Sequence, residues 1–220
     1  EDKYIIVNYH YVVGKTDSFL PISSRFCLSE ELERQVKFLA SSASNVRPAL
    51  VWEAARAGEK GRFFALTFDD GLRGHYKEAL PILLKYNLKA TFFPITCVFG
   101  GRMPVAHKIQ ALLSKLPAAA LIDAFHAFME KFHPEVHPYY LIPKDRRLTG
   151  KRLHEELLVA NFKEMMLSLH DELKRHFLDY SFKLNGLDEN ALSRLIFMDK
   201  GELAALKKKG MEIGVHTHGH

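Results

Sequence analysis

The chain has 220 residues, of which 47% are hydrophobic and 26% charged, as is typical of an ordinary globular protein. No apolar run approaches the roughly 20 residues that a membrane-spanning helix requires, and two distant cysteines, Cys27 and Cys97, form neither a disulfide framework nor a CxxC metal pair. The net charge is +5, but the basic clusters at 144–147 and 207–209 lack interleaved aromatic residues, which argues against a nucleic-acid partner.

The first 96 residues alternate between short apolar runs and helical patterns. Residues 3–9 are a β-branched apolar run and predict a buried strand. A helix is expected over 29–40, with its first residue as N-cap and acidic residues in its first turn. A second strand at 63–68, a helix at 73–86 and a third strand at 89–95 follow. This alternation predicts parallel strands with helical crossovers, and therefore an α/β fold.

The pattern changes in the middle of the chain. Residues 97–198 contain no convincing strand, and 105–131 and 150–177 have helical periodicity. We interpret 97–198 as a helical insertion in an α/β domain. The regular alternation returns with a short helix at 199–209 and a fourth strand at 211–215.

Two clusters of polar residues follow predicted strands, where functional residues of parallel sheets gather. Asp69-Asp70 comes after the second strand, and His216-x-x-x-His220 comes after the fourth. Alone, the first could be a solvated acidic turn and the second a histidine-rich exposed end. Together, Asp70, His216 and His220 make a two-histidine, one-carboxylate metal set with room for water. Metal-bound water can attack a carbonyl, with Asp69 placed to take its proton, so the pattern predicts metal-assisted hydrolysis of an amide or ester.

The same residues resemble the signatures of the polysaccharide deacetylase family (NodB homology, carbohydrate esterase family 4). Residues 66–71 (LTFDDG) are similar to the first signature, and residues 212–220 (EIGVHTHGH) to the second, which has the form H-[ST]-x-x-H. Residues 8–12 (NYHYV) resemble the opening strand of the family. Further similar segments, in the order of the family, are 79–83, 90–93 and 199–210. The resemblance covers 1–96 and 199–220 and is weak between them.

The resemblance implies a function and a set of site residues. Asp69 would be the general base, and Asp70, His216 and His220 would hold one divalent metal ion, with zinc expected and cobalt or another divalent ion as alternatives. The substrate would be an N-acetylated glycan or glycan precursor, from which the enzyme removes N-acetyl or O-acetyl groups with metal-bound water as nucleophile. Its identity is not encoded in these signatures, and both a cytoplasmic and an exported protein fit.

Other residues near the signatures have weaker assignments. Thr217 occupies the Ser/Thr position of the second signature and would orient its loop. His10 either lines the site and contacts substrate or has a structural role. His218 lies between the two ligand histidines and has no assigned role, and His75 is expected at the surface.

The sequence also departs from the family, whose fold is an irregular (β/α) barrel. Only four strands are predicted, and the later signatures, which supply an arginine-containing loop, further aspartates and the general-acid histidine, are absent. We therefore expect 1–220 to be the N-terminal portion of a deacetylase domain, an incomplete barrel without its C-terminal half. Such a chain would be inactive or nearly so by itself, and its open strand edges would favour self-association.

Two other readings stay open. The alternating histidines of 216–220 also occur in amidohydrolase and PHP-type metal hydrolases, although there such a motif begins the barrel. A catalytically inactive metal- or glycan-binding relic of the deacetylase fold is the non-enzymatic alternative. Phosphatase activity would identify the first, and metal binding without turnover would identify the second.

Overall fold

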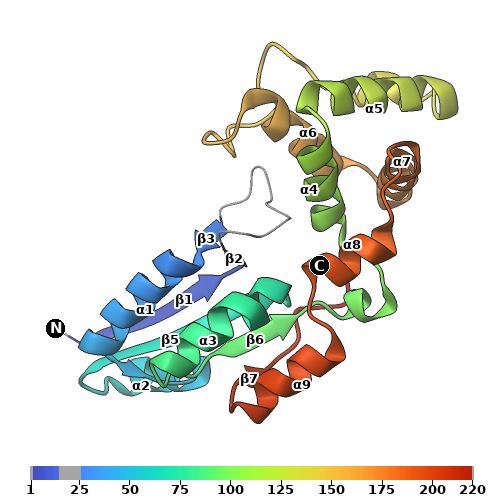
Figure 1. Ribbon diagram of the computed structural model, residues 1–220. Helices are drawn as coiled ribbons and strands as arrows, with labels where there is room; N and C mark the ends of the chain where they lie inside the picture. The colour runs from blue at the N-terminus through green and yellow to red at the C-terminus, as the bar shows by residue number, and fades with distance from the viewer. Residues whose placement is uncertain (1, 15–25, 220) are drawn as a thin grey trace. The chain divides into compact units, whose positions relative to one another are not determined.

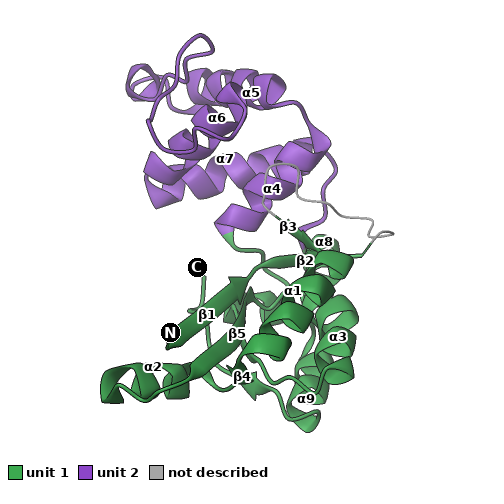
Figure 2. Ribbon diagram, turned by 90° about the vertical axis from the view of Figure 1, so that its left-hand side faces the viewer, with its two compact units in different colours: residues 1–20, 25–104, 190–220 green, residues 21–24, 105–189 purple. Residues whose placement is uncertain are grey.

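The computed structural model describes residues 2–14 and 26–219, which divide into two compact units. Unit 1 contains the described residues up to 104 and those from 190 onward, and unit 2 contains residues 105–189 (Figure 2). The predicted insertion, 97–198, therefore includes all of the helical part of unit 2 and also segments at both of its ends that belong to unit 1.

A five-stranded parallel sheet forms the centre of unit 1 (Figure 1). Its strand order is β1-β5-β6-β7, and the short β4 also pairs with β5. The strands are β1 (Lys3–Tyr9), β4 (Ser44–Asn45), β5 (Arg62–Asp70), β6 (Thr91–Pro94) and β7 (Glu212–Ile213). Every pairing is parallel, which confirms the predicted α/β class with helical crossovers. Within the described residues the sheet is open, with β1 and β7 at its edges, so a closed barrel is not observed in them.

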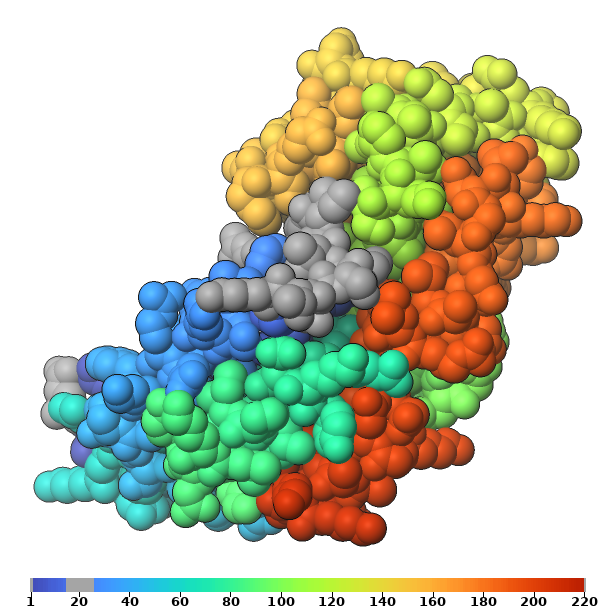
Figure 3. All heavy atoms as spheres, in the orientation of Figure 1, coloured from blue at the N-terminus to red at the C-terminus, as the bar shows by residue number. Residues whose placement is uncertain are grey.

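Helices cover the sheet of unit 1. Their bounds are α1 (Ser29–Ser42), α2 (Pro48–Ala57), a π-helical turn η1 (His75–Ala79), α3 (Leu80–Lys85), α8 (Glu189–Ile196) and α9 (Lys200–Lys208). A short parallel pair, β2 (Tyr11–Val13) and β3 (Phe26–Leu28), leads into α1. Helices α1 and α3 lie side by side on one face of the unit (Figure 3), where Glu33 accepts hydrogen bonds from Lys85 and Tyr86.

The core of unit 1 is built from the central strand and the helices above it. Phe64, Leu66 and Phe68 of β5 are fully buried, because this strand has neighbours on both sides. The Phe68 ring stacks on Tyr9 of β1 at 5.2 Å and on Phe92 of β6 at 4.8 Å between centroids. The stacked rings fix the three strands to one another just before their carboxyl ends, which is where the candidate site lies.

The described residues of unit 2 form helices joined by loops and turns, with no strand among them. Its elements are α4 (Val105–Lys115), α5 (Ala118–Phe132), the 3-10 turn η3 (His137–Tyr139), α6 (Leu157–Ser168) and α7 (Asp171–Leu184). Phe177 of α7 contacts Phe125 of α5 and Phe162 of α6 edge to face, which places aromatic rings at the centre of the unit. Within the described chain no single helix is long and apolar enough to cross a membrane, and only the bent pair α4 and α5, which turn by 117°, passes that test together.

Several local predictions are wrong. Ser29 is the first helical residue of α1, and the cap position belongs to Leu28, whose side chain makes no capping bond. Strand β4 and helix α2 have no counterpart among the predicted elements, because a two-residue strand and a ten-residue helix between loops have weak periodic signals. The two long helices predicted in the middle of the chain are each divided in two, at Pro117 and near Leu169. By contrast, Asp199 forms a capping box with Glu202 at the start of α9.

Candidate functional site

The two signatures meet at the carboxyl edge of the parallel sheet. Asp70, the last residue of β5, pairs with Pro94 at the end of β6. His216 donates its backbone N–H to the Pro94 carbonyl at 3.0 Å, so it lies one strand further along the same edge. Across this edge, His216 Nε2 lies 3.6 Å from Asp70 Oδ1. The structure therefore brings together two residues that are 146 positions apart in the sequence (216 − 70).

Asp70 is buried in a strained backbone conformation. Only 5% of its side chain is exposed, and its φ of 71° lies in the left-handed region. A buried carboxylate is costly unless a cation or donors compensate it. Nearby, burial raises the pKa of the Tyr11 hydroxyl above its usual range, and the negative charge of Asp70 raises it further, so Tyr11 keeps its proton. Strained backbone held in place by its surroundings is a feature of functional sites.

Gly71 completes this turn, and here only glycine fits. Its φ is 72°, and a Cβ atom at this position would lie 2.7 Å from Pro94 Cβ and 2.9 Å from Pro94 Cα. Consecutive left-handed residues at the end of β5 turn the chain away from the sheet. The glycine of the Asp-Asp-Gly sequence is thus required by the close approach of β6.

The Asp69 carboxylate is held by a short chain of hydrogen bonds. Asn8 Nδ2 donates to Asp69 Oδ2 at 2.8 Å, and Thr67 Oγ1 donates to Asn8 Oδ1 at 2.9 Å. Since the Asn8 oxygen accepts from Thr67, its NH₂ group faces Asp69. His10 Nε2 lies 3.9 Å from the same Asp69 oxygen, which places His10 beside this carboxylate. Asn8 was part of the resemblance but had no predicted role.

His75 is fully buried, and the expectation of a surface residue is wrong. Its Nε2 lies 2.6 Å from the His10 carbonyl oxygen, and its ring packs against Phe68 and Phe92. Burial lowers the pKa of His75 to about 4, so the imidazole is neutral near pH 7 and donates to that carbonyl. The expectation failed because His75 lies on the side of the helix that faces the core, which its position in the sequence does not reveal. His75 holds the backbone from which the His10 side chain extends.

The loop that carries the second signature is held by the segment after β6. Thr96 N donates to the Thr217 carbonyl at 3.2 Å, and Cys97 N donates to the His218 carbonyl at 3.0 Å. Thr96 Oγ1 and His218 Nδ1 lie 2.9 Å apart, so His218 anchors the loop. Thr217, which is largely exposed, has a φ of 60°, an unusual value for a β-branched residue.

The predicted metal set is only partly described. Asp70 and His216 face each other, and His220 lies outside the described residues. Within residues 2–14 and 26–219, no group of three or more histidine, cysteine, aspartate or glutamate side chains is arranged to hold a metal ion. One carboxylate oxygen and one imidazole nitrogen at 3.6 Å are ligand types that suit zinc and related ions.

Comparison with known proteins links one segment of the chain to a family. Residues 56–111 match the family model described as polysaccharide deacetylase, a segment that contains Asp69 and Asp70. This match supports the resemblance inferred from the first signature at residues 66–71, whereas the second signature, at 212–220, lies outside the matched segment. No curated protein matches the chain.

Several solved structures have weak similarity to the chain, and two of them are described as deacetylases. The Streptococcus pyogenes deacetylase PplD, in complex with acetate, is 25% identical over 43% of this chain and 43% of its own, with a TM-score of 0.37. IcaB from Ammonifex degensii is 28% identical over 44% of this chain and 40% of its own, with a TM-score of 0.36. The BpsB deacetylase domain from Bordetella bronchiseptica is 12% identical over 96% of this chain and 53% of its own, with a TM-score of 0.39. The chain thus spans about half or less of each of these proteins.

Proposed function

From the premise that this chain carries a polysaccharide deacetylase segment, we propose that the protein is a metal-dependent hydrolase that removes N-acetyl or O-acetyl groups from a glycan or glycan precursor. The observation that supports this most directly is the meeting of both signatures at one sheet edge, where His216 Nε2 lies 3.6 Å from Asp70 Oδ1. The segment that matches the family contains only the first signature, whereas this contact joins the first signature to the second.

The residues at this edge fit a divalent cation. Asp70 is buried, which favours a compensating positive charge, and His216 offers an imidazole nitrogen beside it. In the proposal these two residues and His220 hold the ion. A divalent ion there, with zinc expected, would lower the pKa of a bound water and polarise the acetyl carbonyl.

The remaining residues orient groups and move protons. Asp69 accepts the proton of the attacking water, while Asn8 and Thr67 keep its carboxylate in one orientation. His10, 3.9 Å from Asp69, lines the substrate side of this carboxylate. Thr217, in its left-handed conformation, sets the direction of the loop that presents His216. Such fixed positioning supports catalysis because the groups need no reorganisation when substrate binds.

For the fold, we propose that the open sheet is part of an irregular (β/α) barrel. Five parallel strands with helical crossovers, and edges at β1 and β7, are compatible with part of an irregular (β/α) barrel. In that proposal, further strands pair with the two edges in the complete protein, and a general acid for the leaving group comes from outside the described residues.

Acetate release tests the function. The protein expressed from its complete reading frame is incubated with N-acetylated and O-acetylated glycan oligomers, alongside Asp69→Asn, Asp70→Asn and, as a matched control, Asp145→Asn in an exposed loop of unit 2. We expect acetate release by the wild type and the control, and its loss in both site variants. Metal binding without acetate release would favour a binding relic, and phosphatase activity alone would favour the other class of metal hydrolase.

A further inference from the structure

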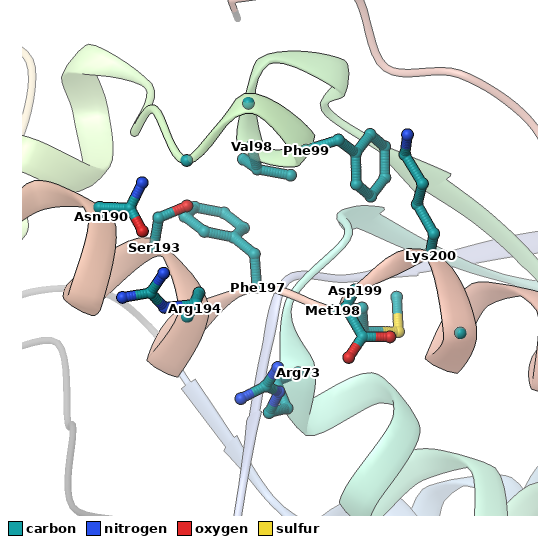
Figure 4. A pocket seen from close by; sticks show the side chains of 13 residues that line it. Arg73, Val98, Phe99, Asn190, Ser193, Arg194, Phe197, Met198, Asp199 and Lys200 are labelled. Atoms are coloured by element: carbon teal, nitrogen blue, oxygen red, sulfur yellow. The ribbon is translucent and has the colours of Figure 1, made fainter.

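A pocket of about 780 Å³ opens in unit 1 beside the candidate site. Figure 4 shows its side chains: Asn190, Ser193 and Arg194 come from α8, Val98 and Phe99 from the segment after β6, and Lys200 from the start of α9. Phe197, Met198 and Asp199, which connect α8 to α9, lie between these groups, and Arg73 follows the turn after β5. None of the lining residues has a role in the proposed reaction.

Backbone hydrogen bonds tie the pocket to both signatures. Met198 N donates to the Gly71 carbonyl at 2.9 Å, and Phe197 pairs with Leu72 in an antiparallel bridge. The pocket floor is therefore attached to the turn that carries Asp69 and Asp70. On the other side, Val98 and Phe99 directly follow Thr96 and Cys97, which bind the His216 loop. A ligand group in this pocket would be adjacent to the proposed reaction site.

The charges that line the pocket are mostly positive. Arg73, Arg194 and Lys200 carry positive charge, and Asp199 is the only acid among the lining residues. Asp199 accepts the Glu202 N–H at 2.8 Å in the capping box of α9, and Arg73 pairs with Glu202 at 3.2 Å. The side chains of Arg194 and Lys200 are exposed and make no ion pair or hydrogen bond within the described part of the chain. Two cations thus remain available for an anionic ligand.

The rest of the lining is apolar and partly aromatic. Val98, Phe197 and Met198 are buried, with at most 8% exposed, and Phe99 is partly exposed at the rim. The flat carbon–hydrogen face of a sugar ring packs well on such a surface, while charged groups at the rim select an anionic substituent. The combination fits a sugar better than a small inorganic anion, which would gain nothing from the apolar floor.

We propose that this pocket binds an acidic sugar unit of the glycan substrate, one that carries a phosphate or a carboxylate group. The inference rests on the proposed function, and it specifies the substrate as an anionic glycan. Arg194 and Lys200, which lie on opposite sides of the pocket in Figure 4, attract the anionic group, and the apolar floor contacts the sugar ring. The acetylated sugar then occupies the neighbouring position at Asp69 and Asp70.

Binding of small probes tests this without relying on turnover. Isothermal titration of the complete protein with glucose 1-phosphate, glucuronic acid and glucose compares phosphate, carboxylate and neutral forms of one ring. We expect at least one anionic sugar to bind about tenfold more tightly than glucose, and Arg194→Gln and Lys200→Gln each to weaken that binding about 5- to 10-fold. Lys208→Gln, an exposed cation on α9 outside the pocket, is the matched control and should leave the affinity unchanged.

The outcomes separate the two proposals. Absence of binding, equal affinity for all three probes, or equal effects of Lys200→Gln and Lys208→Gln would overturn the pocket assignment, whatever the acetate assay gives. Selective binding that is unaffected by Asp70→Asn, in a protein that releases no acetate, would support the pocket and reject the deacetylase. The arm that binds, phosphate or carboxylate, identifies the acidic group. Equal unfolding temperatures for all variants exclude misfolding as the cause of lost binding.

Discussion

The turn at residues 69–71 and the histidine loop at residues 216–219 are the two halves of the candidate site, and they are built differently. The turn ends the central strand of the sheet, with Asp70 buried and Asp69 bound by Asn8. The histidine loop follows a two-residue edge strand and is mostly exposed. Its connection to the rest of unit 1 runs mainly through backbone hydrogen bonds to Pro94, Thr96 and Cys97.

This difference indicates that the turn and the histidine loop tolerate substitutions to different degrees. The turn is fixed by packing, so substitutions there affect both stability and chemistry. The exposed loop is fixed mainly by main-chain bonds, so most substitutions there should change the free energy of unfolding by no more than about 1 kcal/mol. Single substitutions test this contrast, and the largest effect is expected at Asp69.

Replacing Asp69 should cause the largest loss. In Asp69→Asn the proton acceptor is gone while the side-chain shape is kept, and we expect acetate release to fall by about 10²- to 10⁴-fold. Metal content should stay at the wild-type value, because Asp69 is not a proposed ligand. Steady-state assays and elemental analysis of the same preparation measure both quantities. Unchanged turnover would remove Asp69 from its role as general base.

His75 should make the stability of the protein sensitive to acid. Its pKa is about 4 when folded and about 6.5 in an unfolded chain, so the unfolded state binds more protons between these values. The contribution of neutral His75 to the free energy of unfolding is complete above about pH 6.5. It is lost as the pH falls toward 4, by up to about 3 kcal/mol. In His75→Gln, urea unfolding at pH 7 and pH 5 should show a smaller stability difference than in the wild type. His154→Gln, an exposed residue of unit 2, should show the wild-type difference.

Loss of Asn8 should disturb the orientation of the base. The hydrogen bond from Asn8 Nδ2 to Asp69 Oδ2 is 2.8 Å long and involves a charged acceptor. We expect Asn8→Ala to lower kcat about tenfold, which corresponds to about 1.4 kcal/mol, with KM and metal content unchanged. Thr67→Val, which removes the hydroxyl that orients Asn8, should act in the same direction and more weakly. A change in KM with kcat unaffected would contradict this positioning role.

The smallest effect is expected in the histidine loop. Thr217 has a φ of 60°, where a β-branched side chain is strained and asparagine is tolerated. Thr217→Asn should therefore relieve this strain and raise the free energy of unfolding by about 0.5–1 kcal/mol. The hydrogen bond from Thr96 N to the carbonyl of residue 217 is kept in the variant. Thermal unfolding measures this change. A clear loss of stability would mean that the Thr217 side chain contributes more than its strained backbone costs.

Much of the framework could be predicted from the sequence, because long apolar runs have strong periodic signals. The strands β1, β5 and β6 and the polar residues after them follow from such runs. The site itself depends on long-range register, which no local pattern contains. The roles of Asn8 and His75 arise only when β1 lies beside β5 and the helix after the turn packs on both. A buried histidine and a surface histidine look alike in sequence, and their difference comes from tertiary packing.

The most direct test of the account is the metal content of the purified protein after incubation with zinc and removal of excess ion. Wild type, Asp70→Ala and His216→Ala are compared, with His154→Ala, an exposed histidine of unit 2, as the control. We predict one divalent ion per chain in the wild type and the control, and loss of the ion in both site variants. Retention of the ion in Asp70→Ala and His216→Ala would contradict a single metal site at the carboxyl edge of β5, β6 and β7.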